Sequence, residues 1–434
     1  MSSKLGAHVL SGNDSVKAML DAGCKVFKFV SQYNQLGLFI DPNVLVVGRE
    51  YMAFPFANDL YNSGLSPFDA AHKFIYDLPN NQGKSQLGIY LANPRIKHWE
   101  GCNEPSFVDH AGQMWYGQFE IERMKIMDGL GLKCVIGNFS TGTPPDELWN
   151  DFVPAVKHAR DHGHILGLHE YSSPWIWWMT GSFQIQRDAN GKELNWNEYD
   201  KNILHAGGSG WTTLRYRHVI DKFLSPAGCS DAKIVITEFG LDGISPVPIG
   251  TSTGSWRKNR DEFWNRHDGI SDPISYWRGS ERDTERYYAE QLIWYDKEIR
   301  KDANVLGATI YIVGGFGGTW AEFDIDKTRV VNYLCDYINQ ERNVMNPQPS
   351  TNVETPPIIE TPPAVKSRAW GVDTSGWKVD YNNQPPKWDI VKQEGASFVI
   401  GKCTDFDVDY YVPFADRIWK DTEIRVRASE MTLG

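Results

Sequence analysis

The chain has 434 residues and a formal net charge of −11. This acidic balance disfavours binding to a nucleic-acid backbone or to an anionic membrane surface, so we expect neither as a partner. Aromatic residues make up 13% of the chain and include 17 Trp, more than a packed core requires. Indole faces stack on the apolar faces of pyranose rings, so the composition favours a carbohydrate ligand.

Cysteine spacing and targeting signals limit the compartment and the cofactors. The six Cys residues show no C-x-x-C spacing, which predicts neither a zinc site nor a redox-active pair. The sequence begins "MSSKLGAHVL", without the apolar core of a secretory signal, and it has no apolar run long enough to span a bilayer. We therefore expect a cytoplasmic protein, or one released by lysis or another non-classical route. No metal ion or organic cofactor is expected, and the oligomeric state stays open.

Short runs rich in Val, Ile and Phe predict eight strands before residue 345. They are Leu5–Leu10, Lys25–Ser31, Val44–Gly48, Ile96–Cys102, Lys133–Gly137, Ile165–Tyr171, Lys233–Phe239 and Val305–Val313. The helix-like stretches are Asp14–Ala22, Pro67–Tyr76, Gly112–Met127, Asp146–His162, Thr212–Phe223, Arg282–Arg300 and, closing the series, Thr328–Glu341. Strands that alternate with helices in this way predict a (β/α)8, or TIM, barrel over residues 1–345 rather than an open sheet.

The loops after the sixth, seventh and eighth predicted strands are long and rich in Trp. They contain Trp175, Trp177, Trp178, Trp196, Trp211, Trp256, Trp264, Trp277 and Trp320. In TIM barrels all strand-to-helix loops lie on the C-terminal face, which carries the active site. The set therefore predicts a Trp-lined cleft on that face, with small loop cores as the alternative.

Composition changes sharply after the predicted barrel. Residues 346–368 are rich in Pro, Thr and Glu, which cannot continue a helix or a sheet, so they predict a stiff, extended linker. Residues 369–434 then follow a strand–helix–strand pattern, which predicts a partial second α/β unit.

The stretch "WEGCNEPS" (Trp99–Ser106) ends the fourth predicted strand with a carboxylate. Because Pro105 cannot continue a strand ladder, Asn103 and Glu104 are expected at the strand exit. The seventh predicted strand ends in "IVITEFG", which places Glu238 at the same face of the barrel. Glycoside hydrolysis requires two facing carboxylates, one to protonate the leaving oxygen and one to attack or stabilise the anomeric centre.

"WEGCNEP" on the fourth strand and "TEFG" on the seventh resemble the signatures of the clan A glycoside hydrolases, the retaining 4/7 superfamily. The resemblance covers about Leu5–Asn343. It implies that Glu104 is the acid/base, that Glu238 is the nucleophile, and that Asn103 hydrogen-bonds the sugar 2-hydroxyl. Retention predicts carboxyl groups about 5–5.5 Å apart.

Three further candidates lie on the predicted strands. His169 and Tyr171 are two residues apart in "LHEYS" and share a face. In the resembled clan a His and a Tyr here line the cleft, whereas a satisfied core histidine is the alternative for His169. Arg49 ends the third strand, where it is expected either to hold Glu238 ionised or to form a plain surface ion pair.

Two loop Trp residues complete the predicted substrate-binding set, Trp175 after the sixth strand and Trp320 after the eighth. Trp320 resembles the late aromatic platform of the clan. Glu100 lies four residues before Glu104 and shares its strand face, so we interpret it as a structural partner for Arg or Lys.

The last segment resembles the opening of a family-25 glycoside hydrolase, a muramidase. The resemblance rests on "GVDTSGW" and "FVIGKCT" between Trp370 and Thr404, and it implies that Asp373 occupies an active-site position. Asp405 and Phe406 replace the expected Glu-Gly, and fewer than seventy residues cannot close a barrel, so we interpret the unit as truncated or degenerate and not as a working active site.

The sequence thus predicts a retaining β-glycosidase that hydrolyses an oligo- or polysaccharide by double displacement. Two alternatives stay open. One is a carbohydrate-binding barrel without turnover, and the other is a cell-wall (peptidoglycan) lytic protein, which the muramidase-like segment motivates. The sugar, the linkage and the choice between exo and endo action are not predicted.

Overall fold

The computed structural model describes residues 2–11, 14–51, 57–80, 82–172, 176–177, 180, 208–242, 255–257, 283–315 and 319–345, with three short segments beyond them. The chain separates into two units, Met1–Pro349 and Ser350–Gly434. In the second unit β9 (Gly371–Asp373), β10 (Phe398–Ile400) and β11 (Thr432–Leu433) form a parallel sheet in the order β11-β10-β9. The predicted linker and most of the muramidase-like segment lie outside the described residues, so both stay predictions.

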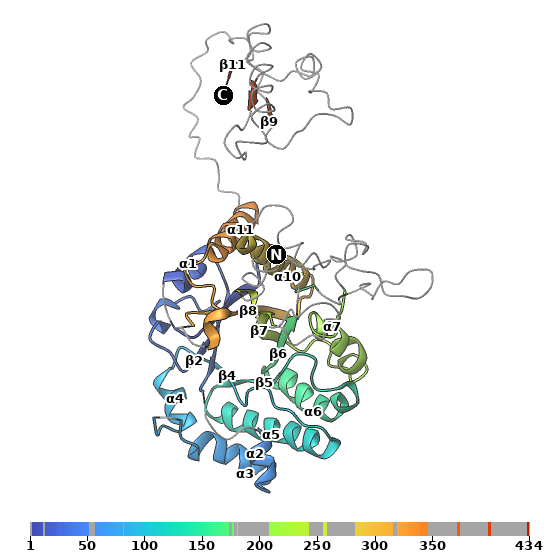
Figure 1. Ribbon diagram of the computed structural model, residues 1–434. Helices are drawn as coiled ribbons and strands as arrows, with labels where there is room; N and C mark the ends of the chain where they lie inside the picture. The colour runs from blue at the N-terminus through green and yellow to red at the C-terminus, as the bar shows by residue number, and fades with distance from the viewer. Residues whose placement is uncertain are drawn as a thin grey trace, which may run out of the picture. The chain divides into compact units, whose positions relative to one another are not determined.

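Eight parallel strands form a closed barrel in the first unit (Figure 1). They are β1 (Leu5–Val9), β2 (Val26–Val30), β3 (Leu45–Arg49), β4 (His98–Glu100), β5 (Lys133–Phe139), β6 (Ile165–Ser172), β7 (Ile234–Leu241) and β8 (Val305–Val313). Each pairs with the next in sequence, and β8 pairs with β1, where Ala308 lies opposite Leu5. The TIM-barrel prediction is therefore confirmed.

The strand sequences explain why they could be recognised. A parallel barrel covers both faces of its sheet, so its strands are continuously apolar rather than alternating. In β1, β2, β6 and β7 every residue is buried. Polar residues inside such strands must therefore contact one another or line a cavity.

Helices surround the barrel (Figure 1). They are α1 (Asp14–Ala22), α2 (Ala57–Asn62), α3 (Pro67–His72), α4 (Gln86–Ala92), α5 (His110–Gly129), α6 (Asp146–His162), α7 (Arg215–Val219), α10 (Thr284–Ile299) and α11 (Arg329–Met345). Local signals set several boundaries: Asp109 caps α5 by accepting a hydrogen bond from the Gly112 N–H at 2.8 Å, and Gly163, whose φ is 73°, caps the C-terminus of α6. Two predicted helices are shorter, because α3 and α7 each continue into a π-helical turn, at Lys73–Asp77 and Ile220–Leu224.

Two strand ends differ from the prediction in ways that affect the site. The fourth strand was expected to reach Cys102, but β4 ends at Glu100, and Glu104 lies in the turn that follows, with φ of 45°. The seventh was expected to end at Phe239, but β7 continues to Leu241, so Glu238 lies inside the strand.

A buried ion pair lies between α5 and the barrel wall. The Arg123 guanidinium donates to Glu120 at 2.7 Å and to the carbonyl oxygens of Trp99 and Val135 at 3.3 and 2.9 Å. This network therefore links α5 to β4 and β5. Among the helices that the structure describes, none combines the length and the hydropathy needed to cross a bilayer.

Candidate active site

A cavity of about 240 Å³ opens where the barrel strands end. Its lining residues are His8, Leu10, Val30, Arg49, Tyr51, Asn103, Glu104, Tyr171, Glu238, Asp242, Tyr311, Trp320 and Phe323. They come from β1, β2, β3, β6, β7 and β8 and from the segments that follow β1, β3, β4, β7 and β8. The cavity therefore lies on the C-terminal face, where TIM-barrel enzymes carry their sites.

Glu104 is held at the cavity by its backbone and by its side chain. Its N–H donates to the carbonyl oxygen of Asn138 at 3.1 Å, which fixes the turn after β4. Its Oε1 lies 2.8 Å from Nδ1 of His169 on β6, and about a third (35%) of its side chain is exposed. A positive φ is uncommon for a residue other than Gly and is retained where the surroundings enforce it. The turn that directs Glu104 into the cavity therefore holds its backbone in an unfavourable conformation.

Glu238 is more deeply buried, and its two oxygens have different partners. Oε1 lies 2.8 Å from Nζ of Lys28 and 3.1 Å from Nη1 of Arg49. Oε2 accepts a hydrogen bond from the Tyr171 hydroxyl at 2.8 Å and lies 3.5 Å from Nδ1 of His169. One oxygen is therefore held by two cations, and the other, on the His169 side, by a neutral donor.

Both carboxyl groups have a lowered pKa. Burial raises the pKa of Glu238, but the charges of His169, Lys28 and Arg49 outweigh it and hold this pKa well below its usual value. Burial likewise raises the pKa of Glu104, and the hydrogen bond and charge of His169 outweigh it there, with Glu238 acting in the opposite direction. Glu238 is thus ionised at neutral pH. Glu104 is the more exposed and more weakly compensated of the two.

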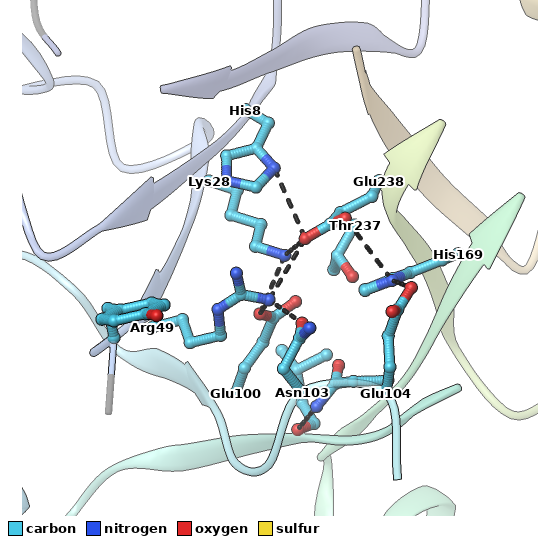
Figure 2. A network of polar contacts seen from close by, with 12 residues as sticks. His8, Lys28, Arg49, Glu100, Asn103, Glu104, His169, Thr237 and Glu238 are labelled. Carbon is cyan, nitrogen blue, oxygen red and sulfur yellow. Dashed lines mark hydrogen bonds and ion pairs between the residues drawn. The ribbon is translucent and has the colours of Figure 1, made fainter. Parts of the chain in front are cut away.

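Glu238 belongs to a largely buried group of four charges, with Lys28, Arg49 and Glu100, drawn in Figure 2. Lys28 Nζ is 3.0 Å from Oε2 of Glu100, and Arg49 Nη1 is 3.7 Å from the same oxygen. Both cations therefore bridge Glu100 and Glu238. Two positive and two negative charges balance one another, which is the condition under which charged groups are tolerated away from water.

Three residues of this site have side chains that can act as metal ligands. Glu104, His169 and Glu238 each offer one ligand atom, and these atoms lie within 4.8 Å of one another. However, Lys28 and Arg49 already place two positive charges against Glu238, and they would repel a divalent cation. The arrangement fits a pair of ionisable carboxyl groups better than a metal site.

The structure brings most of the predicted site residues together. Arg49, Asn103, Glu104, His169, Tyr171, Glu238 and Trp320 all line the cavity or contact one of the two glutamates. Asn103 accepts a hydrogen bond from Arg49. Trp175 lies outside the described residues. Of the other Trp residues expected in the cleft, Trp177 and Trp256 are buried.

Three residues of the site were not predicted from the sequence: His8, Lys28 and Tyr311. They lie side by side in the barrel, because His8 pairs in register with Lys28 on β2 and with Tyr311 on β8. A signal existed for Lys28, a lone charge in the apolar strand "VFKFV". Tyr311, near the end of β8, lies 5.7 Å from Trp320, ring to ring, beside the residue that resembles the late aromatic platform.

Replacing Lys28 with Met is expected to destabilise the fold by about 3–5 kcal/mol at pH 7, because it leaves buried carboxylates short of a cation. The lowered pKa of Glu238 means that its ionised contacts stabilise the fold above about pH 4.5, and that this contribution is lost as the pH falls through the lowered pKa. Without Lys28 the pKa of Glu238 rises, so the deficit shrinks as the pH is lowered. Urea unfolding between pH 4 and pH 8 measures this.

Lys125→Met is the matched control for Lys28→Met. Lys125 forms an ion pair with Glu122 on the surface of α5, with 55% of its side chain exposed. Exposed pairs contribute less than about 1 kcal/mol, so this variant is expected to unfold nearly as the unmodified chain does. Equal losses in the two variants would contradict the buried charge network.

Solved structures that resemble the barrel at low sequence identity include several glycoside hydrolases. No protein-family model and no curated protein matches the chain. A family 39 glycoside hydrolase from Bacteroides cellulosilyticus WH2 is similar at TM-score 0.44 and 12% identity, over 79% of this chain and 64% of that one. An endo-1,4-β-D-mannanase from Thermotoga petrophila RKU-1 gives 0.42 and 11%, over 78% and 99%.

A third similar structure is a GH5-4 endoglucanase from Clostridium longisporum, at TM-score 0.37 and 13% identity, over 76% of this chain and 86% of that one. The chain spans less than two thirds of the first structures it matches, namely 64% of the family 39 enzyme and 51% of a GH2 β-galacturonidase from Eisenbergiella tayi. A likeness at this level concerns the fold alone, so the chemistry must be argued from the side chains.

Proposed function

We propose that the chain is a retaining glycoside hydrolase that cleaves an oligo- or polysaccharide, with Glu104 as acid/base and Glu238 as nucleophile. The observation that carries the proposal is the pairing of the two side chains, which have oxygen atoms within 4.8 Å of each other. Retaining enzymes keep the two carboxyl groups about 5–5.5 Å apart, whereas inverting enzymes separate them by about 6.5–9.5 Å to admit a water molecule. The short separation supports retention.

The surroundings of each glutamate fit its role. A nucleophile must be ionised at neutral pH, and the cations around Glu238 hold its pKa well below the usual value. Oε1 is engaged by Lys28 and Arg49, so Oε2, on the Glu104 side, is the oxygen that attacks the anomeric carbon. Tyr171 orients this oxygen through its hydroxyl.

Glu104 must be protonated to act as an acid, although its pKa is lowered in the free enzyme. A sugar ring that covers its exposed third would remove it from solvent, and desolvation raises the pKa of a carboxyl group. Nδ1 of His169 lies 2.8 Å from Oε1 of Glu104, so this contact orients the carboxyl group toward the cavity. When Glu238 then becomes an uncharged ester, its repulsion disappears, the pKa of Glu104 falls, and Glu104 is suited to act as the base.

In the first step the bond between Oε2 of Glu238 and the anomeric carbon forms while the glycosidic bond breaks, and Glu104 gives its proton to the leaving oxygen. In the second step Glu104 takes a proton from water, whose oxygen bonds to the anomeric carbon as the bond to Glu238 breaks. Trp320, half exposed at the cavity rim, and Tyr311 supply aromatic surface for the ring.

A test uses p-nitrophenyl β-D-glucoside, -mannoside, -xyloside, -galactoside and -glucuronide, with the reaction followed by proton NMR. We expect turnover of at least one glycoside, with the β-anomer of the sugar appearing first. Initial release of the α-anomer would indicate inversion. Absence of turnover on the whole panel, with sugar binding retained, would favour a carbohydrate-binding barrel, and clearing of peptidoglycan alone would favour a cell-wall lytic protein.

A further inference from the structure

We propose that Glu100 is a positioning residue that sets the reactivity of Glu238 through Lys28 and Arg49. It thereby sets the rate of formation of the glycosyl-enzyme relative to the rate of its hydrolysis. The inference rests on the proposed function, because only a nucleophile gains and loses a covalent bond. Glu100 does not line the cavity described above. Its effect must therefore pass through its neighbours.

The geometry gives Glu100 a direct route to the nucleophile. One atom, Nζ of Lys28, lies 3.0 Å from Glu100 and 2.8 Å from Glu238. Another, Nη1 of Arg49, lies 3.7 and 3.1 Å from the same two carboxylates. The side chains of Lys28 and Glu100 are fully buried. Water therefore screens their interactions little, and each carboxylate competes for the same two cations.

Charge counting shows what Glu100 changes during the reaction. In the free enzyme the four groups sum to zero, since Lys28 and Arg49 balance Glu100 and Glu238. In the glycosyl-enzyme Glu238 is an uncharged ester, so the group carries one net positive charge. Without Glu100 the remaining groups would carry one net positive charge in the free enzyme and two in the glycosyl-enzyme. The extra charge favours the ionised form of Glu238, which makes it a weaker nucleophile and a better leaving group.

Several other ionisable groups face this cluster from neighbouring elements, and the pH behaviour of Glu238 depends on them too. They are His8 on β1, His169 and Tyr171 on β6, Tyr311 on β8, and Glu104 after β4. A substitution at Glu100 leaves all of them in place. A change in the pH profile can therefore be assigned to the loss of one negative charge.

Glu100→Gln keeps the side-chain shape and removes the charge. On the p-nitrophenyl glycoside that the unmodified enzyme cleaves fastest, kcat/KM is expected to fall about tenfold, because bond formation slows. The acid limb of its pH profile is expected to move down by about one unit, since a charge at this range shifts a pKa by about 1–3 units. The burst of p-nitrophenol, which reports accumulation of the glycosyl-enzyme, is expected to shrink because hydrolysis of the ester speeds up.

Glu120→Gln is the matched control. It also removes a buried carboxylate from a cation, Arg123 at 2.7 Å, but it does not touch the cavity. It is expected to lower the urea midpoint while leaving the acid limb and the burst of the folded enzyme unchanged. The double variant Lys28→Met with Glu100→Gln restores a neutral site of Arg49 and Glu238, and its acid limb is expected to move back up.

If Glu100→Gln behaves as Glu120→Gln does, Glu100 is merely structural and the inference fails, while the proposed function stands. If Glu100→Gln does not fold, the double variant decides: its acid limb is expected near that of the unmodified enzyme, and an acid limb that stays about one unit lower would contradict the charge balance. Absence of turnover by the unmodified enzyme on every glycoside would remove the proposed function and this inference with it.

Discussion

Replacing Glu238 with Gln is expected to lower kcat on aryl β-glycosides by about 10⁴- to 10⁶-fold, the range seen when the nucleophile or its partner is removed from other hydrolases. The amide cannot attack the anomeric carbon, yet it keeps the side-chain shape and an oxygen that accepts from the Tyr171 hydroxyl. Binding of the product sugar should persist. Turnover assays and calorimetric titration with that sugar measure the two effects separately.

Chemical rescue makes the test of Glu238 specific. Glu238→Gly leaves room for azide, which attacks from the face of the missing carboxylate, so an activated β-glycoside is expected to give the α-glycosyl azide. Glu170→Gln is the control. This neighbouring β6 carboxylate is buried, and it accepts hydrogen bonds from the Leu214 N–H and the Tyr295 hydroxyl at 2.7 and 2.6 Å. It should cost stability but not turnover. More than about 1% of turnover left in Glu238→Gln would exclude a nucleophilic role.

The barrel could be predicted because each strand can be recognised from its own residues. Each strand is a short apolar run, since a parallel barrel leaves neither face of its strands to water. The predicted Val305–Val313, Asp14–Ala22 and Asp146–His162 coincide with β8, α1 and α6. Boundaries failed where tertiary contacts decide them, as at β4, where Gly101 to Glu104 leave the ladder and the Glu104 N–H pairs with Asn138 instead.

The charge network could not be predicted in the same way. Lys28 and Glu100 are far apart in sequence, and the pattern of each strand says only that its position is buried. Their contact depends on the register of the strands around the barrel. This register places Lys28 opposite His8, and it pairs the end of β3 with β4, which carries Glu100. Glu100 was interpreted as a partner for Arg or Lys, and it does contact Lys28 and Arg49. Its connection to Glu238 through both cations appears only in three dimensions.

Trp composition also gave an incomplete view of the site. A Trp in a long loop can line a cleft or fill a core, and both reduce exposed apolar area. Trp320 lines the cavity, whereas Trp256 is buried and stacks on Tyr288 with ring centroids 5.2 Å apart. Nothing in the spacing of these residues distinguishes the two outcomes, because loop paths follow no period.

Replacing Glu104 with Ala is expected to have an effect that depends on the leaving group. General acid catalysis contributes about 10²- to 10⁴-fold, and it is needed most when the departing oxygen is a poor leaving group. An oligosaccharide should therefore lose the full factor. A 2,4-dinitrophenyl β-glycoside should lose little in the first step, and its glycosyl-enzyme should accumulate because the base for the second step is missing. Rapid-quench kinetics and intact-protein mass spectrometry measure this.

Azide distinguishes Glu104 from Glu238 by stereochemistry. With Glu104→Ala the glycosyl-enzyme still forms on Glu238, so azide attacks it from the opposite face and the β-glycosyl azide is expected. Glu122→Gln, on the surface of α5 and paired with Lys125, is the control and should behave as the unmodified enzyme does. An α-glycosyl azide from Glu104→Ala would exchange the roles assigned to Glu104 and Glu238. Equal losses of activity on substrates with good and poor leaving groups would remove the acid role of Glu104. The two products together test the spatial arrangement directly, since each requires a carboxylate on one defined face of the sugar.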